Sequence, residues 1–153
     1  MLRDIHTNEP RAIQRTALTA NGEKIGRMTL GPKTGAAIKL SADADVADHI
    51  TIGEGLETVL SGVALGYTPA WAVGDAGELA QFPVLDGVAS LTILVDNDKT
   101  ETGQRAAREC SRRWTSTGRE VFRLVPRRTG ADANDLLGCA VRRGAHCSDE
   151  GAA

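Results

Sequence analysis

Residues 91–98 have the sequence Leu-Thr-Ile-Leu-Val-Asp-Asn-Asp, an apolar stretch that ends directly in two acids. A short apolar run of this kind, rich in branched side chains, is typical of a strand buried inside a parallel sheet. We therefore predict a strand over residues 91–95, with Asp96 and Asp98 just beyond its carboxyl end. Because side chains two positions apart on an extended backbone point the same way, the two carboxylates should share one side.

Residues 49–55 repeat the arrangement, because the apolar stretch that begins at His49 ends in Gly-Glu-Gly. We predict a strand over residues 49–52 that delivers Glu54 to the same sheet edge, where ligands of open parallel sheets bind. Three acids without Cys or His suit a hard cation such as Mg²⁺, for which Mn²⁺ can substitute. Glu54, Asp96 and Asp98 are therefore the candidate metal ligands.

Gly53 and Gly55 flank this glutamate and should let the backbone turn sharply and approach a phosphate. A helix predicted from Leu56 would direct its amino terminus at the same place, which favours an anion. We expect both glycines to contribute to phosphate binding.

Strands and helices alternate from residue 49 onward, which favours an α/β fold with a mostly parallel sheet and flanking helices. The remaining elements of this part are predicted as strands over 70–73 and 120–125 and helices over 56–65, 74–79, 102–115 and 131–141. The helix over 56–65 should bury one apolar face, made of Leu56, Val59, Leu60 and Val63.

The first 48 residues follow a different pattern, with loose alternation and a turn signal at Asn21-Gly22. They predict a small antiparallel meander with strands over 12–19, 24–30 and 36–40, followed by a connector or short helix over 41–48. The expected organisation is a β-rich lead-in over 1–48, an α/β domain over 49–141 and a flexible tail over 142–153.

The composition, with a net charge of −2 over 153 residues, is that of a globular domain. No apolar run approaches the roughly 20 residues that span a bilayer, and no signal peptide is evident, so we expect a cytoplasmic protein that does not bind membranes. Three cysteines suggest free thiols. Cys139, His146 and Cys147 form a poor zinc-ligand set, because they lack a Cys-x-x-Cys pair.

Basic residues are unevenly distributed, since residues 105–153 hold ten arginines and six acids. Arg105, Arg108 and Arg112 on the predicted helix over 102–115 could bind nucleic-acid phosphates, and a solvated helix face is the alternative. His49 is expected to be structural. The rings of Trp71 and Trp114 could pack in the core or stack on a base.

These motifs resemble those of Toprim domains. Residues 52–58, Ile-Gly-Glu-Gly-Leu-Glu-Thr, are similar to the first Toprim motif, and residues 94–98 are similar to the Asp-x-Asp motif. Gly74 matches the small residue between them. The Gly-x-x-Ala-Ala of residues 103–107 and the Asp-x-Asn-Asp within residues 130–136 resemble phage- and plasmid-type primase–helicases. The likeness covers about residues 49–138, and the lead-in resembles the segment before Toprim in those proteins.

The resemblance implies a Rossmann-like fold and a primase-type nucleotidyltransferase of a replication or mobile-element protein. Glu54 would be the general acid/base, or a metal ligand, and Asp96 and Asp98 would hold Mg²⁺. Asp132 and Asp135 match more loosely, as further ligands or helix caps. Lys99 would contact phosphate or lie exposed. The implied partners are DNA, an RNA primer, nucleoside triphosphates and a helicase or other replication domains.

Several alternatives stay open. The sequence has no four-Cys zinc module and no Gly-x-x-x-x-Gly-Lys-Ser/Thr loop, so we expect an excised domain or a small stand-alone relative. Topoisomerase chemistry is disfavoured, because the only tyrosine, Tyr67, follows the first predicted helix. A Toprim nuclease, a non-catalytic DNA- or protein-binding module and a phosphatase of the haloacid dehalogenase type remain. The phosphatase motif would be residues 96–100, although that motif normally opens its domain.

Overall fold

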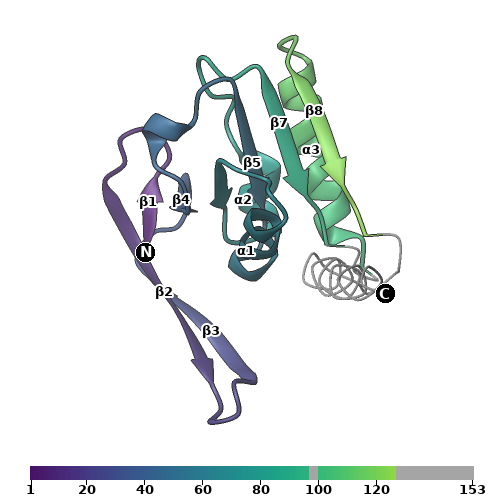
Figure 1. Cartoon of the computed structure of the whole chain (residues 1–153). Helices are drawn as coiled ribbons and strands as arrows, with labels where there is room; N and C mark the ends of the chain where they lie inside the picture. Colours follow the sequence, from purple (N-terminus) through teal and green to yellow (C-terminus); the bar gives the residue numbers. More distant parts are fainter. Residues whose placement is uncertain (97–99, 127–153) are drawn as a thin grey trace, which may run out of the picture.

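The structure is a computed structural model that describes residues 1–96 and 100–126. In these ranges, eight strands form one sheet in the order β3-β2-β1-β4-β6-β5-β7-β8 (Figure 1). The strands are β1 Leu2–Asp4, β2 Pro10–Leu18, β3 Lys24–Leu30, β4 Ala36–Lys39, β5 His49–Gly53, β6 Ala70–Ala72, β7 Ser90–Leu94 and β8 Glu120–Leu124. The helices are the 3₁₀ turn η1 Asp43–Asp45, α1 Leu56–Ala64, α2 Ala76–Gln81 and α3 Thr102–Thr115.

The carboxyl-terminal half of the sheet confirms the predicted α/β fold. Strands β6, β5, β7 and β8 run parallel to one another, and Gly53 lies opposite both Ala72 and Leu94 in the register. The predicted strands and helices of this half match the observed elements to within two residues, and α3 has the predicted bounds. The helix predicted over 131–141 lies outside the described residues.

Helices cover both faces of the parallel strands. One face carries Ile50, Ile52, Leu91 and Ile93, which pack with side chains of α2 and α3 in the main core. The alternate positions face α1, so that Val59 packs against the small side chains of β6. In the described part of the chain, no helix is long and apolar enough to cross a membrane.

The predicted apolar face of α1 is confirmed for Val59 and for the partly buried Leu56 and Val63, but not for Leu60. The buried residues of α1 are Thr58, Val59, Ser61 and Gly62, whereas Leu60 is 49% exposed. The cause is the close approach of α1 to β7, since a Cβ atom at Gly62 would lie 2.3 Å from Cδ1 of Leu94. The helix therefore packs against β7 through the small residue Gly62, and the predicted burial of Leu60 is wrong.

The lead-in strands are antiparallel, as predicted, but they do not follow each other in simple meander order. Strand β1, which the sequence pattern does not predict, pairs with both β2 and β4, and β4 continues the sheet by pairing with β6. A three-residue strand is too short to show periodicity. The second half of β2 pairs with β3, and this hairpin extends beyond β1 and β4 (Figure 1). We call residues 13–30 the β-arm.

Candidate active site at the carboxyl edge of the sheet

The strand order reverses between β5 and β7. The chain leaves β5 through α1 to β6 on one side, and it returns through α2 to β7 on the other side. Ligands of open parallel sheets bind outside the carboxyl ends of the strands at such a reversal. Glu54 follows β5 directly, and Asp96 comes two residues after Leu94, the end of β7. The fold therefore brings both half-buried carboxylates to this reversal point.

The other predicted ligands lie outside the described residues, namely Asp98, Lys99, Asp132 and Asp135, together with the Cys139, His146 and Cys147 set. Within residues 1–96 and 100–126, no three His, Cys, Asp or Glu side chains come together as a metal site. The described donors are thus the carboxylate oxygens of Glu54 and Asp96, whose chemistry suits a hard divalent cation.

Thr58 ends the first motif, and its role was not predicted from the sequence; the structure places it against Asp96. Its hydroxyl group donates hydrogen bonds to the carboxylate, with Oγ1 3.0 Å from Oδ1 and 3.3 Å from Oδ2. Thr58 is only 4% exposed, in the first turn of α1. Helix α1 therefore holds the Asp96 carboxylate in place, and the contact joins residues too far apart for a sequence pattern to predict it.

The backbone on either side of Glu54 is held by the loop after β6. The Val73 amide donates to the Gly53 carbonyl at 3.0 Å, and the Gly74 amide donates to the Glu54 carbonyl at 2.9 Å. Gly74 has φ +102°, a conformation that favours glycine. Gly74, the small residue between the two motifs, is thus needed for a backbone turn that fixes the Glu54 loop.

The structure gives a different physical reason for glycine at the positions beside Glu54 from the predicted one. The chain does bend at residues 54 and 55, but neither Gly53 nor Gly55 has a positive φ, so the bend by itself does not require glycine. A Cβ atom at Gly53 would lie 2.7 Å from Cγ2 of Val59, which means that close packing of α1 requires glycine here. Gly55 is the extended N-cap of α1 and directs the helix amino terminus at this edge. Phosphate binding by the two glycines remains a prediction.

The arginines of α3 fall into different environments. Arg105 and Arg112 are exposed, and Arg108 is half-buried with its Nη2 atom 3.7 Å from a Glu101 oxygen. Arg113, by contrast, donates to the carbonyl oxygens of Ala80 and Phe82 and ties α3 to α2. Nucleic-acid binding by Arg105, Arg108 and Arg112 remains a prediction.

The aromatic and imidazole side chains have structural contacts. Trp71 and Trp114 are both buried, and the Trp114 ring stacks on Phe82 with centroids 6.2 Å apart, so neither ring is available to stack on a base. The imidazole of His49 lies 2.8 Å from the Thr68 carbonyl oxygen and 3.1 Å from an Asp48 carboxylate oxygen.

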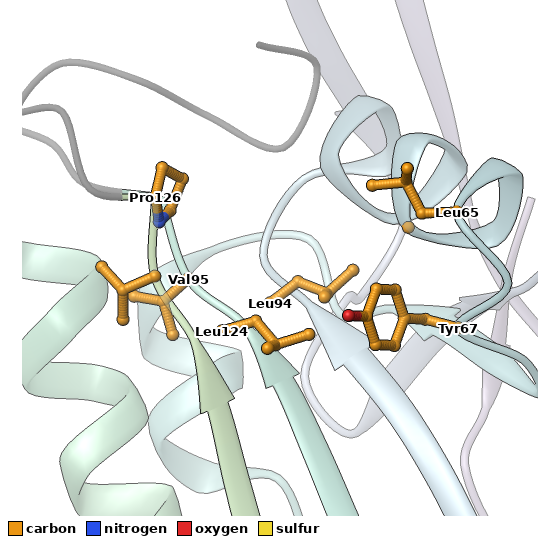
Figure 2. A pocket seen from close by; sticks show the side chains of 8 residues that line it. Leu65, Tyr67, Leu94, Val95, Leu124 and Pro126 are labelled. Carbon is orange, nitrogen blue, oxygen red and sulfur yellow. The ribbon is translucent and has the colours of Figure 1, made fainter. Parts of the chain in front are cut away.

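An apolar cavity of about 120 Å³ lies next to the site, beside the ends of β7 and β8. Figure 2 shows the side chains of Tyr67, Leu94 and Leu124 gathered around it, with Pro126 at its far side. Its lining lacks charged groups, so it cannot offset the desolvation of a phosphate.

Residues 49–142 match a family model described as the Toprim domain. The comparison with curated protein sequences gave no match. Among solved structures, the crystal structure of a DNA primase domain from Pseudomonas aeruginosa is similar, with a TM-score of 0.55 and 17% sequence identity. The alignment covers 95% of this chain and 55% of that one, so the chain spans about half the length of the primase domain. At this identity the likeness is one of fold. From the family match and the geometry of the Glu54–Asp96 edge, the chain belongs to the Toprim domain family.

Proposed function

We propose that the chain is a primase-type nucleotidyl-transfer domain that acts on nucleic acid with Mg²⁺ as its metal ion. The observation that carries the proposal is the pair of half-buried carboxylates, Glu54 and Asp96, at the ends of the neighbouring strands β5 and β7. The fold shared with a DNA primase domain supports this choice among Toprim activities. The phosphatase alternative loses support, because β5 and β6 precede the Asp96 strand in the same parallel sheet.

In the proposed reaction, the hydroxyl oxygen of a primer or first nucleotide attacks the α-phosphorus of a nucleoside triphosphate. A new phosphorus–oxygen bond forms, and the bond to the bridging oxygen breaks, so that pyrophosphate leaves with the electron pair. Glu54 accepts the hydroxyl proton. A general base must lie within reach of the attacking group, and Glu54 lies at the edge where the substrate would bind. Asp96, held by Thr58, and Asp98 would hold the metal ion, which neutralises charge on the phosphates when it is bound.

A Glu54→Gln variant tests the proposal, because it keeps the size of the side chain and removes its charge. We expect template-dependent primer synthesis by the full chain to fall at least about a hundredfold, the usual contribution of a general base. Glu120→Gln is the matched control, since Glu120 begins β8 at the opposite edge of the sheet. Its activity should equal that of the unaltered chain.

Two other outcomes would overturn the proposal. Cleavage of the template without nucleoside triphosphates, lost in Glu54→Gln, would identify a Toprim nuclease. Absence of both activities, together with no Mn²⁺ binding by electron paramagnetic resonance, would identify a non-catalytic binding module. Helicase or other replication partners belong to the same proposal, and co-purification of such proteins with the full chain would test them.

A further inference from the structure

Basic side chains from the β-arm and the loop after it contact two segments next to the Glu54 loop, namely the first turn of α1 and the loop after β6. Arg27 donates to the Gly74 carbonyl oxygen with a 3.2 Å contact, and the Gly74 amide binds the Glu54 carbonyl. Lys24 lies 3.1 Å from Oε1 of Glu57, in the first turn of α1. Lys33, in the loop after β3, pairs with Asp75. The lead-in thus brings three cations to the carboxyl edge of the parallel strands.

These contacts border a polar cavity of about 230 Å³ between the β-arm and the loop after β6. Its lining residues are Leu2, Gln14, Arg27, Thr29, Lys33, Gly74 and Asp75. Gln14 and Thr29 lie opposite each other in the register, and side chains alternate along a strand, so both point to the same face as Arg27. One face of the β-arm therefore offers the Arg27 cation and neutral hydrogen-bonding groups to this cavity, and the following loop adds Lys33.

The ion pairs at this surface are replaceable. The side chains of Lys24 and Glu57 are 47% and 44% exposed, and those of Lys33 and Asp75 are 48% and 32% exposed. Solvent-exposed ion pairs contribute between about 0 and 1 kcal/mol, because water screens them. A phosphate, with its charge and several acceptor oxygens, can take the place of either carboxylate at little cost.

We propose that Lys24, Arg27 and Lys33 form a phosphate clamp for a polynucleotide strand that enters the Glu54–Asp96 edge. In the free protein, Glu57 and Asp75 occupy two of the three cations and are displaced when the strand binds. The clamp rests on the proposed function, since it supplies the strand to that site. Lys24 and Arg27 are three residues apart on β3, a distance of about 10 Å, so the cations follow a repeating backbone rather than surround one phosphate group.

The test is binding of a fluorescein-labelled single-stranded DNA to the full chain, measured by anisotropy over a range of NaCl concentrations in EDTA. Arg27→Gln and Lys33→Gln should each lower the slope of log K against log salt by about 0.7, and should weaken binding at 0.1 M salt about fivefold. Arg15→Gln is the matched control. Arg15 pairs with Met28 and points to the opposite face of the same β-arm.

Removal of the competing carboxylates distinguishes a phosphate clamp from ion pairs that have only a structural role. Asp75→Asn keeps an N-cap side chain for α2, because Asp75 accepts from the Glu78 amide and asparagine caps equally well. This variant and Glu57→Gln should bind DNA two- to fivefold more tightly, since Lys33 and Lys24 are released. Arg27→Lys should retain the salt slope of the unaltered chain.

Three results would overturn the clamp: an unchanged salt slope in Arg27→Gln and Lys33→Gln, an equal loss in Arg15→Gln, or weaker binding in Asp75→Asn. Binding of nucleoside triphosphates but not of the oligonucleotide, lost in the same variants, would also overturn it. Because the assay contains no divalent cation, it reports on the clamp alone. Failure of the proposed catalysis would instead appear as wild-type binding without primer synthesis.

Discussion

The hydroxyl group of Thr58, in the first turn of α1, donates hydrogen bonds to both carboxylate oxygens of Asp96, at 3.0 and 3.3 Å. The two residues are 38 positions apart in sequence, and they meet because α1 packs against β7 through Gly62 and Leu94. One helix therefore carries both the amino terminus that follows Glu54 and the side chain that orients the second acid.

Thr58→Val should weaken Mn²⁺ binding by about tenfold or more, because partners that orient a metal ligand commonly contribute that much. Valine has the shape of threonine without its hydroxyl group, so the fold should persist. Mn²⁺ titration by electron paramagnetic resonance measures the effect, and Thr58→Ser should restore most of the affinity. Equal affinity in all three proteins would show that the hydroxyl group does not position Asp96 for a metal.

Gly53→Ala should destabilise the chain by about 1–3 kcal/mol, the usual cost of forcing an extra methyl group into a packed core. The new Cβ atom would lie 2.7 Å from Cγ2 of Val59. Urea unfolding followed by circular dichroism measures the loss. Gly26→Ala is the control, because a Cβ atom there would meet nothing within 4 Å. A Gly53→Ala protein as stable as this control would contradict the packing argument.

His49 should stabilise the fold more at low pH than at high pH. A hydrogen bond to the Thr68 carbonyl, followed by one to Asp48, raises the pKa of His49 above its usual 6.5. The protonated imidazole is therefore favoured in the folded chain. Its contribution is complete below about pH 6.5 and is lost as the pH rises through the folded-state pKa.

The corresponding measurement is the free energy of unfolding of the unaltered chain and of His49→Gln at several pH values. The difference between them should shrink from pH 5.5 to pH 8.5, and it should be small throughout because the imidazole is half-exposed. A difference that grows with pH would contradict a raised pKa.

Cys110 should resist alkylation in the folded chain. Burial raises the pKa of its thiol to about 12, against the smaller opposite effect of Arg113. Only about one thiol in ten thousand is then ionised at pH 8, and the thiolate is the reactive form. Peptide mapping after iodoacetamide treatment should find Cys110 modified in urea and unmodified in buffer. Rapid modification in buffer would show that the core around α3 opens.

Local patterns in the sequence were sufficient for most of the secondary structure and for the ends of the strands at the site. The apolar run before Asp96 is β7, the run before Glu54 is β5, and the helix over 102–115 has its predicted bounds. Such features depend on periodicity and on residues that begin or end an element, which are short-range properties of the chain. The placement of Glu54 and Asp96 at one edge follows from the parallel order of these strands.

Only the tertiary structure decided which side chains support that edge. Three features depend on how closely α1 and the lead-in approach the sheet. They are the pairing of β1, the exposure of Leu60 and the requirement for glycine at position 53. The contacts of Lys24 with Glu57 and of Arg27 with Gly74 join residues 33 and 47 positions apart. Contacts of this kind are set by the packing of whole elements, and they leave no periodic trace in the local sequence from which they could be predicted.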